Sequence, residues 1–201
     1  MTIVKGSTAR HAEHPIDALF IDRWSPRAMS GEPISHEELM SLFEAARWAP
    51  SAGNTHPWRI LYAHRDTAHW NVFFDLLVER NQKWCRNAAA LLMFISRTTN
   101  EETGKPLKTH SYDSGAAWEN LALQGTLRGL VVHGMAGFDY AKAKTVLHVP
   151  DDFTVEAMAA VGKPGRIEDL PEEFQARESP NSRRPVSQLV FEGYYDRRGG
   201  S

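Results

Sequence analysis

The stretch Ala45–Trp58, AARWAPSAGNTHPW, constrains the fold more than any other part of the 201-residue chain. It joins the end of an amphipathic helical pattern to the start of a strand-like one through a turn of small and turn-forming residues. These residues are Pro50, Ser51, Ala52, Gly53 and Asn54. Such a turn places backbone N–H groups and one side-chain amide at the rim of a sheet, where a flat polar ring could dock. A helix-to-strand connection without a ligand has the same composition, so the turn alone leaves both interpretations open.

The segment Asp22–Arg27, DRWSPR, is the second informative feature. Arg23, Ser25 and Arg27 alternate, and Pro26 disfavours helix at Ser25, so an extended segment would point these three side chains to one side. Two guanidinium groups with a hydroxyl between them suit a phosphate, because arginine offers forked donors and keeps its charge. A solvated surface turn is the alternative interpretation of the same residues.

Length and composition indicate a single domain with a buried core, since 42% of the residues are hydrophobic. We expect residues 1–14 to form a flexible N-terminal arm and residues 15–201 to form one domain that includes the C-terminal tail. A net charge of −2 gives no sign of a nucleic-acid partner. The longest apolar run, Ala88–Ile95, is far shorter than the roughly 20 residues of a membrane helix, so no membrane association is expected.

Helical and strand-like periodicities alternate along the chain. Ser35 followed by Glu38 is a capping-box signature, and the apolar spacing after it predicts a helix that ends at Pro50. Further helices are predicted over residues 16–21, 69–82, 111–128 and 139–147. Strands are predicted over residues 58–65, 88–96, 130–133 and 153–161, followed by an extended tail over 166–180. The polar segment 97–109 is the candidate lid over a pocket, with an inert loop as the alternative.

Side-chain chemistry of the common hydrolases and dehydrogenases is missing. The chain has no G-x-S-x-G, H-E-x-x-H or G-x-G-x-x-G motif. His11 and His14 lack further ligands at a matching spacing, so no metal site is expected. The single cysteine, Cys85, excludes an internal disulfide, fits a reducing cytoplasm, and is interpreted as a structural thiol. An anion cradle and a ring-sized turn without a catalytic side-chain set point to a protein whose cofactor performs the chemistry.

Two segments together resemble the FMN-dependent nitroreductase family. RWSPRAM at Arg23–Met29 is similar to the Arg-x-Ser-x-Arg/Lys segment of that family, and AARWAPSAGNTHPWR at Ala45–Arg59 is similar to its A-P-S-x-x-N-x-Q-P-W turn. The Gly137-Phe138 turn and the Ser182–Pro185 tail follow in the order of the family. The resemblance covers nearly the whole chain.

The resemblance implies an α+β fold with a central mixed β-sheet flanked by helices, in a homodimer whose C-terminal tail extends over the partner subunit. FMN would lie at each of two sites on the interface. Arg23, Ser25 and Arg183 would hold the phosphate with Arg184 nearby, and Trp24 belongs to the same cofactor-binding segment. Arg27 would reach the ribityl chain or the pyrimidine edge. The residues expected on the ring are Asn81, Ala136 and Gly137 of one subunit and Pro50, Ser51, Ala52 and Asn54 of its partner.

Two positions depart from the pattern of the family. His56 stands in place of the usual Gln, which puts any contact of that Gln in doubt, and Trp84 stands where some relatives have a Lys. The positive charge near the ring therefore rests on Arg27, where a cation stabilises negative charge on the reduced flavin.

The implied activity is reduction of nitroaromatics, quinones or similar small electron-poor acceptors. NAD(P)H would pass hydride to flavin N5 and leave before the acceptor binds, which is a ping-pong cycle. Two alternatives stay open. One is a flavoenzyme of the same fold with other chemistry, such as a dehalogenase, an enone or aldehyde reductase, or an oxidase. The other is a non-catalytic flavin-binding protein.

Overall fold

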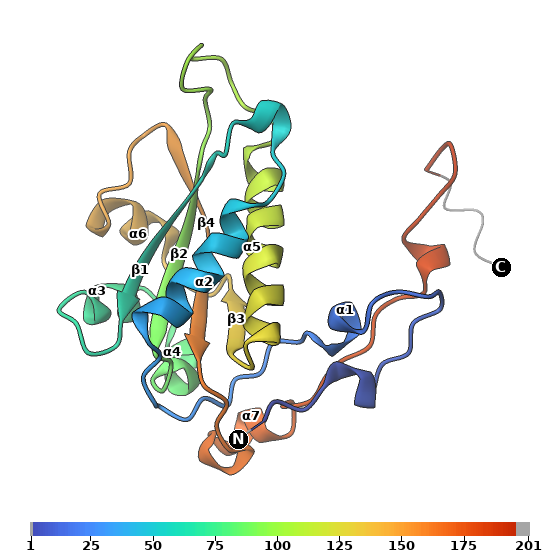
Figure 1. Ribbon diagram of the computed structural model, residues 1–201. Helices are drawn as coiled ribbons and strands as arrows, with labels where there is room; N and C mark the ends of the chain where they lie inside the picture. The colour runs from blue at the N-terminus through green and yellow to red at the C-terminus, as the bar shows by residue number, and fades with distance from the viewer. Residues whose placement is uncertain (1, 196–201) are drawn as a thin grey trace.

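Strand β2 (Ala90–Arg97) forms the centre of the sheet, because every residue from Ala90 to Ser96 is buried. It pairs with β1 (Trp58–His64) on one side and with β4 (Phe153–Gly162) on the other, and β3 (Val131–Met135) pairs with the far edge of β4. The computed structural model describes residues 2–195. The four predicted strands are confirmed, in the spatial order β1-β2-β4-β3 (Figure 1).

The sheet is antiparallel throughout the part of the chain that the structure describes. The α+β class is therefore confirmed, but the prediction of a mixed sheet is wrong for this chain. Strands β2 and β3 do run in the same direction, joined by helix α5 (His110–Leu127), as a crossover connection requires. Strand β4 lies between them, however, so the two parallel strands are not hydrogen-bonded neighbours.

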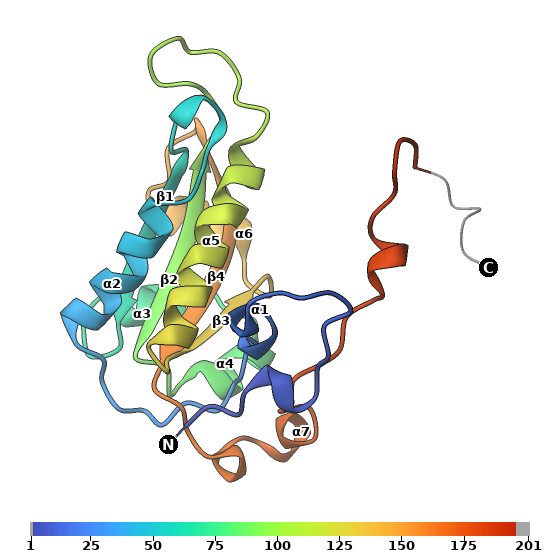
Figure 2. The same cartoon turned by 45° about the vertical axis from the view of Figure 1, so that its right-hand side comes forward.

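Two cores lie on the two faces of the sheet, and alternate residues of β2 divide between them. Leu92 and Phe94 pack with helices α2 (His36–Arg47) and α5 on one face. Leu91 and Met93 face the other core. Residues of α3 (Trp70–Phe74), α4 (Glu79–Cys85) and α6 (Tyr140–Val146) belong to that second core. Figure 2 shows α2 and α5 side by side in front of the sheet.

The segment 69–82, predicted as one helix, is interrupted after Phe74. The two short helices α3 and α4 replace it, because Leu76 and Val78 each use one backbone group on another part of the chain. The Val78 N–H donates to Gly137 O at 3.1 Å, and Leu76 O accepts from the Asp139 N–H at 2.9 Å. Leu77 and Phe138 form an isolated bridge between these bonds. The long-range bonds can replace helical ones here because they give the same backbone N–H and C=O groups a partner. The amphipathic pattern therefore does not lead to one continuous helix.

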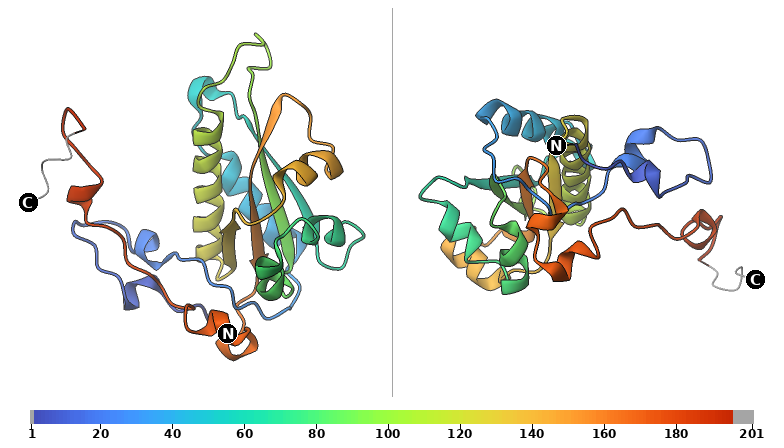
Figure 3. Two further views of the ribbon diagram at one scale, coloured as in Figure 1. Left: turned by 180° about the vertical axis from the view of Figure 1, so that it is seen from behind. Right: turned by 90° about the horizontal axis from the view of Figure 1, so that it is seen from below.

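The C-terminal region is not one extended tail over 166–180, as predicted. It contains a 3₁₀ turn at Ile167–Asp169 and the short helix α7 (Glu172–Gln175), because Leu170 and Phe174 bury their side chains. The chain then runs beside the N-terminal arm and α1 (Ala18–Asp22), as Figure 3 shows from two sides. Residues 186–195, with a 3₁₀ turn at Val186–Gln188, point away from the sheet.

The N-terminal arm contains a 3₁₀ turn at Gly6–Thr8 and docks against α1. Its predicted flexibility stays a prediction. Among the described helices, none has both the length and the apolar character needed to cross a membrane.

Helix α2 begins with the predicted capping box. Ser35 Oγ accepts from the Glu38 N–H at 3.1 Å, and Glu38 Oε2 accepts from the Ser35 N–H at 2.7 Å. The helix ends at Arg47 rather than at Pro50.

Ser35→Ala is expected to lower the free energy of unfolding by about 1 kcal/mol, because it leaves one N-terminal N–H without its side-chain acceptor. Urea denaturation measures this change. Ser35→Asp is the matched control, since its carboxylate retains the acceptor and should keep most of the stability. Equal losses in the two variants would contradict the capping role.

Candidate functional site

A cavity of about 460 Å³ lies where the end of α1, strand β3 and the C-terminal region meet. Five of its lining residues are arginines, and no Asp or Glu is found among the described residues that line it. The lining residues are Arg10, Arg23, Trp24, Ser25, Arg27, His133, Arg177, Ser179, Asn181 and Arg183. Such a concentration of guanidinium groups makes the cavity attractive to an anion.

The segment after α1 supplies three predicted residues to this cavity. Helix α1 is capped at its N-terminus by Asp17, whose side chain accepts from the Leu19 N–H, and at its C-terminus by Arg23, where the backbone becomes extended. Arg23, Ser25 and Arg27 all line the cavity, and Arg23 Nη1 donates to Ser25 Oγ at 3.2 Å. The intervening Trp24 lines it too.

The same segment is fixed at its far end against the turn after β4. The Gly165 N–H donates to Ala28 O at 2.9 Å, and the Ser30 N–H donates to Lys163 O at 3.0 Å. A Cβ atom at Gly165 would lie only 2.5 Å from the backbone carbon of Met29, so the close approach requires glycine. Arg23, Ser25 and Arg27 therefore stand on a segment held at both ends.

Arg27 has a carboxylate beside it. Its Nη1 lies 3.6 Å from Oε2 of Glu178, whose side chain is almost fully buried. The other oxygen, Oε1, accepts from the backbone N–H groups of Arg27 and Ala28. The positive charge of Arg27 is thus partly offset inside the protein. Arg23, by contrast, has a more exposed carboxylate near it, with 3.8 Å between Arg23 Nε and Glu119 Oε1.

The two tail arginines differ in position. Arg183 lines the cavity with Arg23, although the two are 160 positions apart in sequence. Its Nη1 donates to Asn181 Oδ1 at 2.8 Å. Arg184 is exposed and does not line the cavity.

Sequence reasoning missed His133 of strand β3. Its Nδ1 lies 2.8 Å from Pro26 O, and because a carbonyl oxygen only accepts, Nδ1 carries the proton. Burial lowers the pKa of His133 to about 4, and the nearby charges of Arg27 and Arg23 act in the same direction. The side chain is therefore neutral at pH 7. The one sequence signal for it was a polar residue inside the apolar strand.

A series of contacts connects His133 with Gly137 through Trp84 and Asn81. The ring of Trp84 lies 4.5 Å from the His133 ring, and Trp84 Nε1 donates to Asn81 Oδ1 at 3.2 Å. Asn81 Nδ2 in turn donates to Gly137 O at 3.0 Å. Asn81 and Gly137, predicted from separate motifs, therefore meet, and Ala136 is exposed beside them.

The turn Pro50–Asn54 lies elsewhere. None of its residues lines the arginine cavity, and Figure 1 shows it at the N-terminal end of α5, whereas α1 lies near the C-terminal end of that helix. The buried carboxylate of Asp113 accepts from the Ala52 N–H at 3.1 Å and fixes the turn. Asn54 has a positive φ of 56°, and His56 has one of 46°. Such left-handed backbone in non-glycine residues concentrates at functional sites.

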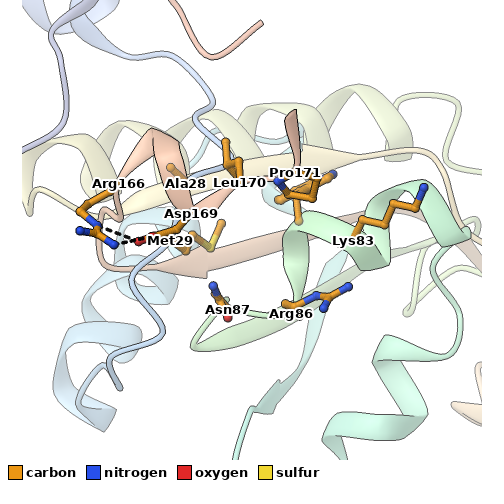
Figure 4. A pocket seen from close by; sticks show the side chains of 10 residues that line it. Ala28, Met29, Lys83, Arg86, Asn87, Arg166, Asp169, Leu170 and Pro171 are labelled. Atoms are coloured by element: carbon orange, nitrogen blue, oxygen red, sulfur yellow. Dashed lines mark hydrogen bonds and ion pairs between the residues drawn. The ribbon is translucent and has the colours of Figure 1, made fainter. Parts of the chain in front are cut away.

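A second cavity, of about 270 Å³, has Trp84 in its lining together with residues 166 and 169–171 of the C-terminal region (Figure 4). Two of its three cations have carboxylate partners, because Arg166 forms two bonds with Asp169 and Lys83 lies 3.2 Å from Glu173 Oε1. It is therefore a weaker anion site than the arginine cavity. Cys85 also offers no reactive group, since the thiol is fully buried and burial raises its pKa.

The depressed pKa of His133 predicts a pH dependence of stability. The unfolded side chain binds a proton near pH 6.5, whereas the folded one binds it only near pH 4. Stability is therefore complete above pH 6.5 and falls as the pH decreases towards 4, by up to about 3 kcal/mol from this group. Urea denaturation between pH 7.5 and 4.5 should show a shallower loss in His133→Gln than in the wild type. His69→Gln, at an exposed position, is the control; an unchanged slope in His133→Gln would contradict the assignment.

Comparisons with known proteins identify the family of this chain. The profile of the Nitroreductase family matches residues 21–77, which include both the Arg23 segment and the Pro50 turn. A solved structure described as an oxidoreductase containing FMN is 46% identical in sequence, with a TM-score of 0.89, over 93% of this chain and 96% of that one.

The similarity to curated relatives covers different shares of the chain. 5,6-Dimethylbenzimidazole synthase from Rhodospirillum rubrum is 27% identical over 78% of this chain and 85% of its own length. The putative NADH dehydrogenase/NAD(P)H nitroreductase SCO7141 from Streptomyces coelicolor is 42% identical, but over only 22% of each chain. Because the similarity to the solved oxidoreductase spans nearly the whole chain and the family profile covers both signature segments, this chain belongs to the nitroreductase family.

Proposed function

We propose that the protein is an FMN-dependent oxidoreductase that takes hydride from NAD(P)H and reduces small electron-poor acceptors. The observation that carries this proposal is the cavity with five arginines and no lining carboxylate, into which the two ends of the chain bring Arg23 and Arg183. A terminal phosphate carries about two negative charges and several acceptor oxygens, so it matches that donor set. The FMN contained in the 46% identical relative has such a phosphate.

We assign each part of the site to one part of this cofactor. Arg23, Ser25 and Arg183 would hold the phosphate, and Arg27 would reach the ribityl chain or the pyrimidine edge of the ring. Asn81, Ala136 and Gly137 would meet the ring. A Cβ atom at Gly137 would lie 2.7 Å from Asn81 Nδ2, so a larger residue here would displace the amide that faces the ring.

The protein would act as a homodimer. The Pro50–Asn54 turn lies outside the arginine cavity of its own chain, so a turn that covers the ring would have to come from a second copy. The tail supports this arrangement, because apolar side chains of residues 186–191 are exposed as they leave the domain, including Leu189 at 57% and Val190 at 67%. A second subunit would bury them. A reducing cytoplasm is the proposed compartment, since Cys85 is buried and forms no disulfide.

When bound, FMN supplies the redox chemistry for which the described side chains offer no reactive group. The protein would position the cofactor, keep His133 neutral beside Trp84 and leave one face open to small molecules. Donor and acceptor would occupy that face in turn, in a ping-pong sequence, with nitroaromatics and quinones as the acceptors.

A different flavin chemistry on the same fold is the second candidate. It is supported by the synthase from Rhodospirillum rubrum, whose similarity covers 78% of this chain, far more than the 22% for the nitroreductase from Streptomyces coelicolor. Turnover with a panel of acceptors separates the two candidates.

The visible spectrum of the purified protein, with FMN added where needed, tests the proposal. We expect flavin absorption that anaerobic NADH or NADPH bleaches and that a nitroaromatic or a quinone restores. Arg23→Ala and Arg183→Ala should each weaken FMN binding by about 10- to 100-fold, since each removes a charged hydrogen bond. Arg47→Ala, which removes an exposed arginine on α2, should bind as the wild type does. A colourless protein in excess FMN would refute the proposal, and a yellow protein that no nicotinamide bleaches would indicate a non-catalytic binder.

The pair Arg27 and Glu178 should set the flavin potential in opposite directions. Arg27→Ala is expected to weaken FMN binding and lower the potential, because it removes the cation near the ring. Glu178→Gln keeps an oxygen for the backbone N–H groups but removes the charge beside Arg27, so it should raise the potential. Spectroscopic redox titration measures both. An unchanged potential in an Arg27→Ala variant that still holds FMN would exclude this role.

A further inference from the structure

Arg10, from the N-terminal arm, is buried in the wall of the arginine cavity with only 8% of its surface exposed. All three of its side-chain nitrogens donate to amide oxygens. Nε donates to Asn181 O at 2.7 Å and Nη2 to Asn181 Oδ1 at 3.1 Å. Nη1 donates to Arg23 O at 2.6 Å and to Ile21 O at 3.1 Å. One side chain thus joins the arm, the end of α1 and the C-terminal region.

The bonds of Arg10 place it between the two arginines that are proposed to hold phosphate. It binds the backbone oxygen of Arg23 directly, and it shares Asn181 Oδ1 with Arg183, whose Nη1 lies 2.8 Å from the same atom. No ion pair of Arg10 with a carboxylate occurs among residues 2–195. Burial and the charges of Arg183 and Arg23 lower the pKa of Arg10, yet arginine remains charged at neutral pH. Three like charges therefore lie together, and an anion in the cavity would relieve their repulsion.

The arm reaches this position through a close backbone fit. A Cβ atom at Gly6 would overlap Ile21 O and would lie 3.1 Å from Arg10 Nη1, so the arm can approach α1 only because residue 6 is glycine. Trp24 Nε1 donates to Val4 O at 2.7 Å, and the Val186 N–H donates to Glu13 Oε2 at 2.9 Å. These contacts dock the arm on both of the segments that Arg10 joins.

We propose that Arg10 is a positioning residue of the cofactor site that makes it selective for ligands with a terminal phosphomonoester. It holds the Arg23 segment and the Arg183 tail around one anion, and it adds a third fixed positive charge. The inference rests on the proposed binding of FMN. It assigns the N-terminal arm, which lies outside both signature segments, a role in the affinity for FMN.

Comparison of FMN with riboflavin, which lacks the phosphate, tests this role. Arg10→Gln keeps hydrogen-bonding groups but removes the charge and the forked geometry. We expect it to weaken FMN binding by about 10- to 100-fold, while riboflavin binding changes by less than about 3-fold. Asn181→Ala should have the same selective effect, because it releases Arg183 while Arg10 keeps its charge. Lys5→Ala removes another cation of the arm that does not line the cavity, and it should leave both affinities unchanged.

Three results would overturn the inference. They are wild-type FMN affinity in Arg10→Gln, equal weakening of FMN and riboflavin, and a comparable loss in Lys5→Ala. Should Arg10→Gln fail to fold, Arg10→Lys and Asn181→Ala give the same comparison, since the lysine keeps the charge but cannot make four bonds.

A separate measurement distinguishes failure of this inference from failure of the proposed function. Inorganic phosphate should raise the thermal midpoint of the wild type and raise it much less in Arg10→Gln. If the wild type binds no FMN, the proposed function fails, and the phosphate shift still decides the role of Arg10. If the wild type binds FMN and Arg10→Gln binds it equally well, only the inference about Arg10 fails.

Discussion

The fold brings several positively charged arginines together around one cavity, and the repulsion among them is the main physical constraint on the site. Arg10, Arg23 and Arg183 come from the arm, the end of α1 and the C-terminal region, and they surround one cavity. Amide oxygens of Asn181, Ile21 and Arg23, rather than carboxylates, satisfy the donors of Arg10. Such oxygens fix the geometry without neutralising the charge, so the cavity keeps a positive potential that an anion can use.

Strand β3 of the sheet forms one wall of this cavity and leads from it to the turn at Ala136 and Gly137. It carries His133 into the cavity. The break between α3 and α4 matters here, because the bond from the Val78 N–H to Gly137 O replaces a helical one and brings Asn81 onto the same turn. The break in the helical pattern thus lies where Val78 and Asn81 bond to Gly137.

Short-range features were predictable because they depend on neighbours in sequence. The alternation of Arg23, Ser25 and Arg27, the capping box at Ser35 and the fully buried strand β2 all follow from local geometry and from the period of apolar residues. The single helix over 69–82 was wrong because Gly137, far away in sequence, accepts the hydrogen bond of the Val78 N–H. The extended tail over 166–180 was wrong because Leu170 and Phe174 bury their side chains, and local turns form around them.

By itself, the sequence determined the two signature segments, the alternation that points three side chains one way, and the positions of most strands and helices. Only the tertiary structure decided that β4 lies between the two parallel strands, that burial lowers the pKa of His133, and that Arg10 joins the N-terminal arm to the C-terminal region. The reason is physical: periodicity and turn chemistry act over a few residues, whereas burial, pKa and the meeting of like charges also depend on groups far apart in sequence, such as His133 with Pro26 and Arg10 with Asn181.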